Sequence, residues 1–169
     1  MAAPDRLRIP YEDDEYSRFD LVGKYGEDQQ FMAFITGAMP MDWSVDNYSE
    51  LYLRTNWQRH KRWYAVVHHF DADGNHLRTD ARLGGTDDDP QIWDQADQHL
   101  KTLVDELGPL RLEDINVCLF SVEIDNYLFG LIYERLEEDV APEEDIDWVM
   151  LEPNDIMFHR PWDSGEYST

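Results

Sequence analysis

The segment 91–107 carries the most complete set of helix signals in the chain. Asp89 and Pro90 supply an N-cap and a first helical residue, and Gly108 followed by Pro109 supplies a stop. Between them, apolar side chains recur with the helical period and form one stripe: Ile92, Trp93, Ala96, Leu100, Leu103, Val104 and Leu107. Such a stripe must be buried, so the segment predicts a long helix lying on a sheet.

Two pairs of strand-like segments precede this helix. Residues 18–24 and 29–38 are rich in β-branched and aromatic side chains and are joined by a turn at 25–28. Residues 63–70 and 76–83 form the second pair, joined by Asp-Ala-Asp-Gly-Asn, in which glycine supplies the positive φ of a tight turn. Each pair therefore predicts an antiparallel hairpin.

The segments after the helix are more apolar. Residues 115–122 and 127–134 are apolar on both faces, which is typical of strands in the middle of a sheet. Asp125 and Asn126, between them, tolerate the left-handed conformation of a hairpin turn. Two central antiparallel strands are expected here, followed by a last strand at 146–151.

These segments predict an α+β fold. We expect a mostly antiparallel sheet of five to seven strands backed by one long helix, as a two-layer sandwich. Residues 1–169 should form a single acidic domain, with an aromatic C-terminal tail, 152–169, packed on or beside it. The predicted core contains Trp93, Leu100, Leu103, Val117, Leu119, Phe129 and Leu131.

The net charge narrows the choice of partners. The chain has 37 Asp and Glu against 14 Lys and Arg, a formal charge of −23. Such a field repels nucleic-acid backbones and anionic membranes and speeds encounter with basic proteins. The chain is therefore expected to bind neither nucleic acid nor membrane directly. An alternative is that the acidity serves only solubility, or adaptation to high salt.

The compartment is expected to be the cytoplasm. Residues 1–10 lack an apolar leader region, and no apolar stretch approaches the ~20 residues of a membrane span. Cys118 is the single cysteine, so no internal disulfide can form. It lies in an apolar run and is predicted to be a buried thiol.

Motifs for catalysis or cofactor binding are absent from the sequence. No serine lies in a G-x-S-x-G elbow, and neither a G-x-x-x-x-G-K-S/T loop nor a G-x-G-x-x-G motif occurs. Paired carboxylates are too numerous for any one pair to indicate acid–base chemistry. We therefore expect a protein that is not an enzyme and has no cofactor.

One cluster has the composition of a metal site: His68, His69, Asp71, Asp73 and His76. Adjacent strand residues point to opposite faces, so His68 and His69 cannot both reach one ion without distortion. A calcium loop starting at Asp71 would need glycine and glutamate where His76 and Arg82 stand. The segment instead predicts a hairpin turn with surface histidines and no bound metal.

A single basic patch interrupts the acidic field. It consists of Arg54, Arg59, His60, Lys61 and Arg62, interleaved with Trp57 and Trp63. We expect these cations to pair with the chain's own carboxylates, although they could also contact an anionic ligand. The preceding segment, 40–55, is predicted to be a loop with at most one helical turn.

The predicted partner-binding site combines acids with aromatic residues near the C-terminus. Tryptophan and tyrosine dominate binding hot spots, while surrounding charges govern encounter. The site comprises Glu137, Glu138, Asp139, Glu143, Glu144, Asp145, Asp147, Trp162 and Tyr167. The alternative is a solvated loop kept soluble by its charge.

Three stretches carry a resemblance to a known family: QQFMAFITGAMP, WQRHKRWYAVVHHFDADGNH and LEPNDIMFHRPWDSGEYST. They resemble small acidic proteins of Streptomyces and other actinobacteria, some of which are labelled formate hydrogenlyase regulatory protein HycA. The chain is also similar in style to bacterial immunity proteins, small acidic cytoplasmic α+β domains that neutralise basic toxins. These resemblances imply a non-catalytic immunity-type inhibitor or regulatory protein that binds a basic protein. The alternatives are a regulatory or metabolic protein with a minor ligand or metal site, and an acidic mimic of nucleic acid.

Overall fold

The strands divide between two large sheets. The computed structural model describes residues 3–13, 21–136, 147–154 and 156–168. The strands in these ranges are β1 (Leu7–Ile9), β2 (Leu21–Tyr25), β3 (Gln29–Ala38), β4 (Arg62–Phe70), β5 (His76–Thr86), β6 (Leu110–Leu112), β7 (Ile115–Val117), β8 (Phe120–Ile124), β9 (Tyr127–Arg135), β10 (Asp147–Glu152), β11 (Ile156–Phe158) and β12 (Tyr167–Ser168). The helices are α1 (Glu50–His60) and α2 (Ile92–Asp105).

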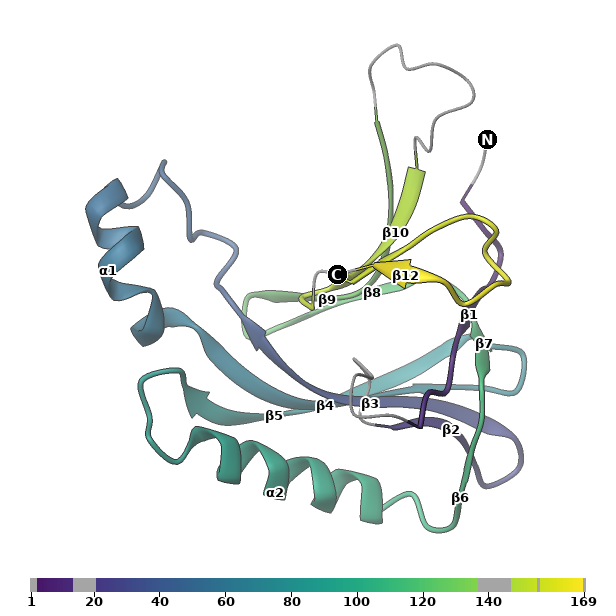
Figure 1. Ribbon diagram of the computed structural model, residues 1–169. Coiled ribbons are helices and arrows are strands. Elements are labelled where there is room, and N and C mark those ends of the chain that lie inside the picture. Colours follow the sequence, from purple (N-terminus) through teal and green to yellow (C-terminus); the bar gives the residue numbers. More distant parts are fainter. Residues whose placement is uncertain (1–2, 14–20, 137–146, 155, 169) are drawn as a thin grey trace.

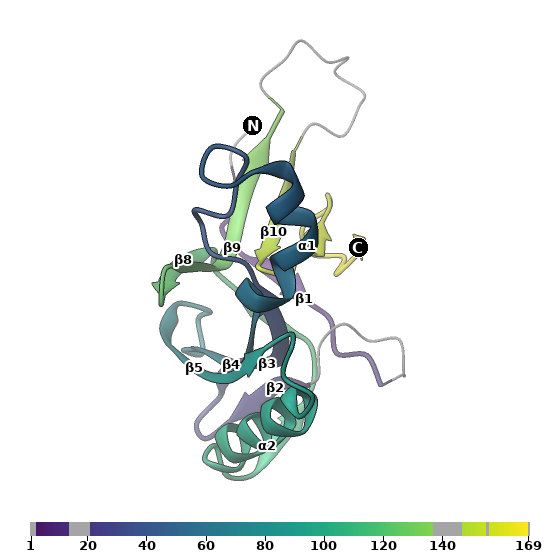
Figure 2. The same cartoon turned by 90° about the vertical axis from the view of Figure 1, so that its left-hand side faces the viewer.

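Two five-stranded sheets and one helix form three layers. The first sheet has the order β5-β4-β3-β2-β6 and the second β12-β11-β10-β9-β8, while β1 and β7 make a two-stranded ribbon. The second sheet lies above the first and α2 lies below it, an order that both views show (Figures 1 and 2). The mostly antiparallel α+β class is confirmed. The prediction of one sheet and one helix in two layers is wrong, because β8 to β12 build a second sheet.

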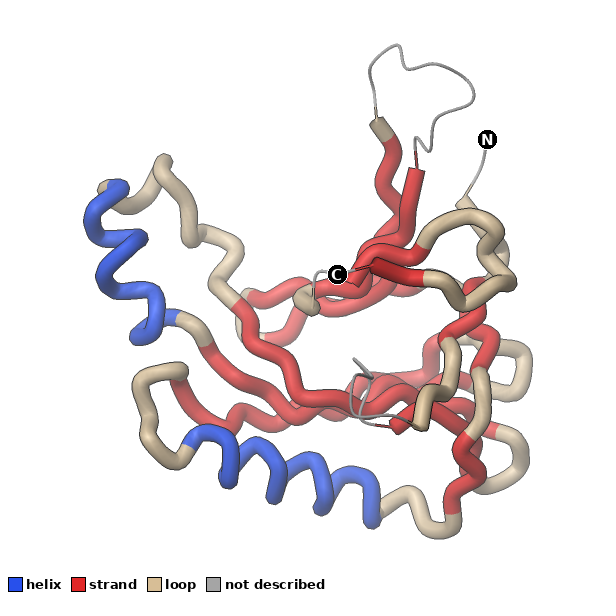
Figure 3. The backbone as a smooth tube through the Cα atoms, viewed as in Figure 1, coloured by secondary structure: helices blue, strands red, loops and turns tan. Residues whose placement is uncertain are grey.

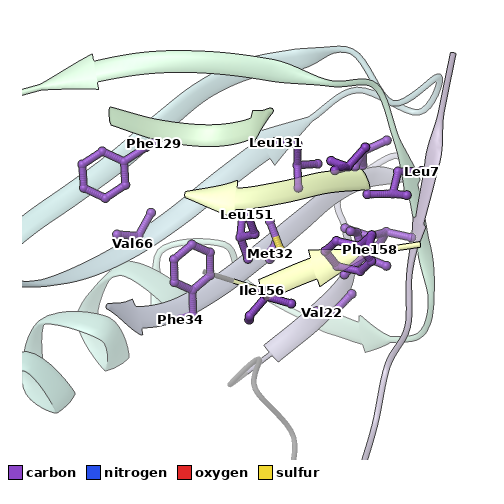
Figure 4. Packing of buried hydrophobic residues seen from close by; sticks show 14 of the residues in the cluster. Leu7, Val22, Met32, Phe34, Val66, Phe129, Leu131, Leu151, Ile156 and Phe158 are labelled. Carbon is purple, nitrogen blue, oxygen red and sulfur yellow. The ribbon is translucent and has the colours of Figure 1, made fainter. Parts of the chain in front are cut away.

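The main core fills the space between the two sheets. Met32, Phe34 and Val66 of the first sheet meet Phe129 and Leu131 of the second, and each of these side chains is at most 1% exposed (Figure 4). Successive side chains of a strand point to opposite faces of its sheet. The residues next to Met32, Phe34 and Val66 in the sequence therefore point away from the second sheet. The first sheet therefore has a second apolar face to cover.

That second face packs against α2. Phe31, Ala33 and Val67 form a separate buried cluster with Leu100 and Leu103 of the helix. The strands β3 and β4 are thus buried on both sides, which explains their continuous apolar sequences. The predicted helix is confirmed, and it begins and ends within two residues of the expected limits. The predicted N-cap is wrong, because Gln91 holds that position and Asp89 instead accepts a hydrogen bond from the Gln91 backbone N–H.

The predicted hairpin turns are confirmed. Asp125 and Asn126 have φ values of 53° and 69°, as the two-residue turn between β8 and β9 requires. Between β4 and β5, a carboxylate oxygen of Asp71 accepts hydrogen bonds from the backbone N–H groups of Asp73 and Asn75. The side-chain amide of Asn75 also donates to the Asp71 carboxylate, and this bond, with the backbone bonds, holds the pKa of Asp71 below its ordinary value.

The predicted single strand 115–122 is wrong. Ile115–Val117 pairs with β1, whereas Phe120–Ile124 pairs with β9 in the second sheet. Cys118 lies between them, and its backbone N–H donates to the carbonyl oxygen of Gly74. The thiol is only partly buried, contrary to prediction. A uniformly apolar run does not reveal the point at which a chain changes sheets.

Helix α1 was not predicted. Ser49 caps it by accepting a hydrogen bond from the backbone N–H of Tyr52, at 3.2 Å. No residue of this helix is buried, so it has no apolar stripe that periodicity could detect. Instead, Trp43 packs on the rings of Tyr48 and His60, and these aromatic contacts hold the helix to the preceding loop.

Most of the predicted core is confirmed. Leu100, Leu103, Val117, Phe129 and Leu131 are buried, and Leu119 is partly buried against the main core. Trp93 is 54% exposed, so its assignment to the core is wrong. It lies at the edge of the helix stripe, where its ring packs against the ring of Trp63.

Within the described residues, neither helix has the length and apolar content of a membrane span.

We predict that Leu103→Ala lowers the free energy of unfolding by about 2–5 kcal/mol, because it leaves a cavity between α2 and the first sheet. Lys101→Ala, at an exposed position two residues away, should change it by less than about 0.5 kcal/mol. Chemical denaturation of both variants is the measurement. Equal stabilities would show that the α2 stripe does not support the first sheet.

Candidate interaction surface

The outer face of the second sheet carries several apolar side chains. Alternation along each strand places Phe129, Leu131, Val149 and Leu151 in the core and the residues between them on the opposite face. The apolar residues on this outer face are Leu128, which is exposed, and Ile132, Trp148, Met150 and Met157, which are half-buried. The two-sided apolar pattern of the sequence is therefore real, but the chain buries one of the two faces fully and the other only in part.

Strand register brings these outer residues together. Met150 lies opposite Ile132 on one side and opposite Met157 on the other, so three strands contribute to one apolar row. Leu128, near the edge strand β8, is 37% exposed. The row crosses β9, β10 and β11, whereas Leu128 lies four residues from Ile132 along β9, with Gly130 between them on this face.

Carboxylates lie opposite two of these apolar side chains. Glu123 of β8 lies opposite Leu128, and Glu134 of β9 lies opposite Trp148. The indole N–H of Trp148 donates to the Glu134 carboxylate at 2.7 Å, which fixes both side chains at the border. An apolar centre with an acidic rim is complementary to a surface with an apolar centre and a basic rim.

No helix in the described part of the chain covers this face (Figure 3). Helix α2 contacts β3, β4 and β5 of the first sheet, and α1 contacts β5. The two sheets share one core but differ on their outer faces, because only the first has a helix over it. We call the outer face of β8–β11 the open face.

Comparison with protein-family models, curated proteins and solved structures returns no match for this chain.

The structure brings together only part of the site predicted from the sequence. Residues 137–146, which hold Glu137, Glu138, Asp139, Glu143, Glu144 and Asp145, lie outside the described residues. Trp162 and Tyr167 are both partly buried against the main core. The Tyr167 hydroxyl donates to Glu12 at 2.7 Å, and the Arg160 guanidinium lies over the Trp162 ring. Both aromatic residues therefore help to fix the C-terminal segment.

Asp147 has an internal role. It is 3% exposed and forms a bidentate ion pair with Arg160, with one N–O distance of 2.7 Å. It also accepts a hydrogen bond from the Tyr133 hydroxyl at 2.8 Å. The bond to Arg160 holds the Asp147 pKa below its ordinary value, so the carboxylate stays charged. Contact between Asp147 and a partner would first require this pair to open.

Two of the three histidines are buried rather than on the surface, contrary to prediction, and His76 is half-buried. His68 is fully enclosed in the main core and His69 is 1% exposed on the opposite face of β4. Nδ1 of His68 bonds to the Thr79 hydroxyl, which also bonds to Nε2 of His76. On the other face, His69 lies between the Tyr25 hydroxyl and the Asp80 carboxylate. Turn chemistry in the sequence indicated an exposed segment, but both sheet faces at this end of β4 are covered.

No group of three potential metal ligands comes together within the described ranges. His68 and His69 bond to different partners because they point away from each other. Asp71 is occupied by turn hydrogen bonds to Asp73 and Asn75. The side chains of His68, His69, Asp71 and His76 are therefore engaged in hydrogen bonds within the protein.

The basic patch also differs from expectation. Arg54 and Arg59 are exposed on α1. In the described part of the chain, no ion pair with a carboxylate is formed by these two residues, by Lys61 or by Arg62. The Lys61 ammonium instead lies over the Trp63 ring, and the Arg62 guanidinium over the Tyr127 ring. Aromatic faces have taken the place of the expected carboxylates.

We predict that His68 makes the protein less stable in acid. Burial, with smaller contributions from His76 and His69, lowers its pKa from 6.5 to about 3. Between these pH values the unfolded chain binds a proton that the folded chain does not, so the stability present above about pH 6.5 is lost as the pH falls. The contribution is about 1.4 kcal/mol per pH unit.

His68→Leu should reduce the slope of unfolding free energy against pH by that amount, measured by denaturation from pH 7 to pH 4. His99→Leu, a change at a partly exposed histidine of α2, is the matched control. A slope unchanged by His68→Leu would mean that another group governs the acid sensitivity.

Proposed function

We propose that this protein is a non-catalytic binding domain that attaches to a basic protein through the open face. The observation that carries the proposal is the half-buried apolar row of Ile132, Met150 and Met157, with Glu134 beside it on β9 and no helix of the described residues over it. Contiguous apolar surface rimmed by polar groups marks interaction sites in soluble proteins.

We place the protein in the cytoplasm, an assignment supported by its single cysteine.

The apolar row and the acids would act at different stages of binding. Burial of the row removes apolar surface from water, at about 25 cal/mol per Å². The net charge of −23 attracts a cationic partner from a distance and speeds encounter. Residues 137–146 join β9 to β10, the strands that carry Ile132 and Met150, so their acids would contribute to this long-range attraction.

An immunity-type inhibitor of a basic toxin, or a regulator of a basic protein, fits this surface. A mimic of nucleic acid would need mainly carboxylates on its contact surface, because its partner recognises phosphate charge. The apolar centre of the open face favours instead a protein partner with its own apolar contact residues. Binding of designed peptides can test whether the open face prefers a ligand with apolar contact residues.

We predict that a synthetic amphipathic helix with leucines on one face and lysines on its borders binds the protein, whereas a scrambled peptide of equal composition binds much more weakly. Met150→Lys should abolish the difference, because it puts a cation in the centre of the row. Leu77→Lys is the matched control, since Leu77 is an apolar residue of β5, in the first sheet, that is 53% exposed. Fluorescence anisotropy is the measurement, and equal binding of both peptides to wild-type protein would rule out the open face.

We also predict that charge and apolar contact affect different rate constants. Neutralising Glu143, Glu144 and Asp145 together should lower the association rate and flatten its dependence on salt, because salt screens charge attraction between proteins, to a range of about 8 Å at physiological ionic strength. Met150→Ala should raise the dissociation rate instead. Stopped-flow measurement with the amphipathic peptide at low and high salt separates the two. Wild-type kinetics in both variants would contradict the proposal.

A further inference from the structure

Strand β5 forms a long free edge of the first sheet. It runs from His76 to Thr86 and, within the described residues, pairs only with β4 (Figure 2). The other edges of the two large sheets are shorter, because β6 has three residues, β12 two and β8 five. An edge strand presents a row of unpaired backbone N–H and C=O groups, and proteins commonly keep such strands short or cover them. Among these edges, β5 is therefore the one best suited to pair with another strand.

The side chains of β5 leave its edge accessible. No residue of this strand is buried, whereas Tyr64 to Phe70 of the neighbouring strand β4 all are. Leu77 is 53% exposed and Leu83 is 43% exposed, although both are apolar. The strand contains no proline, the residue that would remove a backbone donor from the edge. Both its backbone and its apolar side chains are thus available for contact.

Two β-bulges limit the part of β5 that is regular. The register with β4 shifts at two places, which leave Leu77 and Gly84 as extra residues on β5. Between them, residues 78–83 pair with β4 without interruption. A bulge disturbs the outer side of a strand as well as its inner side. A new strand would therefore pair with 78–83.

The charged side chains of this stretch alternate in sign. Arg78, Asp80 and Arg82 point to the same face of the sheet, because successive side chains of a strand point to opposite faces. All three side chains are at least 36% exposed. Like charges on an edge strand oppose pairing with another copy, whereas alternating charges permit it in a register that places opposite signs together.

A second copy of β5 supplies the complementary order of charges. In an antiparallel pair related by a two-fold axis, one residue lies on the axis opposite its own copy. With Asp80 on the axis, Asp80 would face Asp80 and Arg78 would face Arg82, so like charges would repel. With Ala81 on the axis, Asp80 faces Arg82 at two symmetric places and residues 79–83 overlap. Registers centred on other residues overlap over a shorter part of the regular stretch.

We propose that two copies of this protein associate through their β5 strands, with Ala81 on the two-fold axis. The pairing joins the first sheets of both copies into one continuous sheet and gives the outward backbone groups of 79–83 hydrogen-bond partners. Leu83 of each copy lies opposite Thr79 of the other and loses part of its exposed apolar surface. The open face takes no part, so this inference does not depend on the partner proposed for it.

Sedimentation equilibrium of the full chain, from micromolar to millimolar protein, measures this association. We expect a reversible equilibrium between monomer and dimer. The dimer should become tighter as salt rises from low to physiological concentration, because two net charges of −23 repel each other until salt screens them. Binding of the basic peptide to the open face should weaken over the same range of salt, so the two interactions are distinguishable.

Hydrogen exchange locates the contact. The backbone amides of β5 that point away from β4 should exchange more slowly at high than at low protein concentration, because pairing gives them acceptors. The amides of β8–β11 should exchange at the same rate at both concentrations.

Charge variants test the register. Arg82→Asp should weaken the dimer roughly tenfold or more, because two opposite-charge pairs become two like-charge pairs. Arg78→Asp is the matched control: it changes the net charge equally, but position 78 faces Gly84 of the second copy, so the dimer should not weaken to this extent. Asp80→Arg should also fail to self-associate, yet a mixture with Arg82→Asp should form a heterodimer in which each Arg faces an Asp.

Three results would overturn the proposal. The first is a chain that stays monomeric at millimolar concentration and physiological salt. The second is equal weakening by Arg82→Asp and Arg78→Asp, which would mean that charge acts only at long range. The third is slower exchange in β8–β11 and not in β5, which would place the contact on the open face. If Asp80→Arg fails to fold because it loses the bond to His69, the comparison of Arg82→Asp with Arg78→Asp still decides.

Discussion

Burial of β3 and β4 on both faces is the constraint on which the other layers depend. These strands have apolar side chains at successive positions, so one covering layer leaves half of their apolar surface in water. Helix α2 covers one face and the second sheet covers the other. Because the second sheet packs on β3 and β4, its inner face is buried in the main core. Its outer face receives no helix within the described residues, and this asymmetry produces the open face.

The features that could be predicted from the sequence are those set by nearby residues. The β4–β5 and β8–β9 hairpins follow from turn residues, and α2 follows from its stop signal and apolar period. The division into two sheets could not be predicted, because an apolar run is equally compatible with a central strand and with a strand that has an open apolar face. Helix α1 was missed because its support comes from Trp43 and its neighbours and not from a stripe of its own.

The candidate sites were harder to predict than the fold. The sequence indicated acids and aromatic residues as the contact surface, but the structure uses Asp147 and Tyr167 to fix the C-terminal segment. The open face was present in the sequence as the two-sided apolar pattern of 127–134, which was attributed to burial. A cavity of about 420 Å³ that Lys61 and Asn154 line together could not have been predicted, because 93 positions in the chain separate these residues and no local motif relates them. Only a long-range arrangement of strands makes them neighbours.

The N-terminal ribbon strand β1 pairs with β7, and the backbone N–H of Arg8 donates to the carbonyl oxygen of Trp162. Leu7 and Ile9 are buried in the main core through these contacts. During synthesis, an early segment must therefore wait for residues near position 162 to leave the ribosome before it can pack. The order of translation and the order of assembly thus differ in this protein. Leu7 and Ile9 stay exposed to chaperones and proteases until the core closes around them.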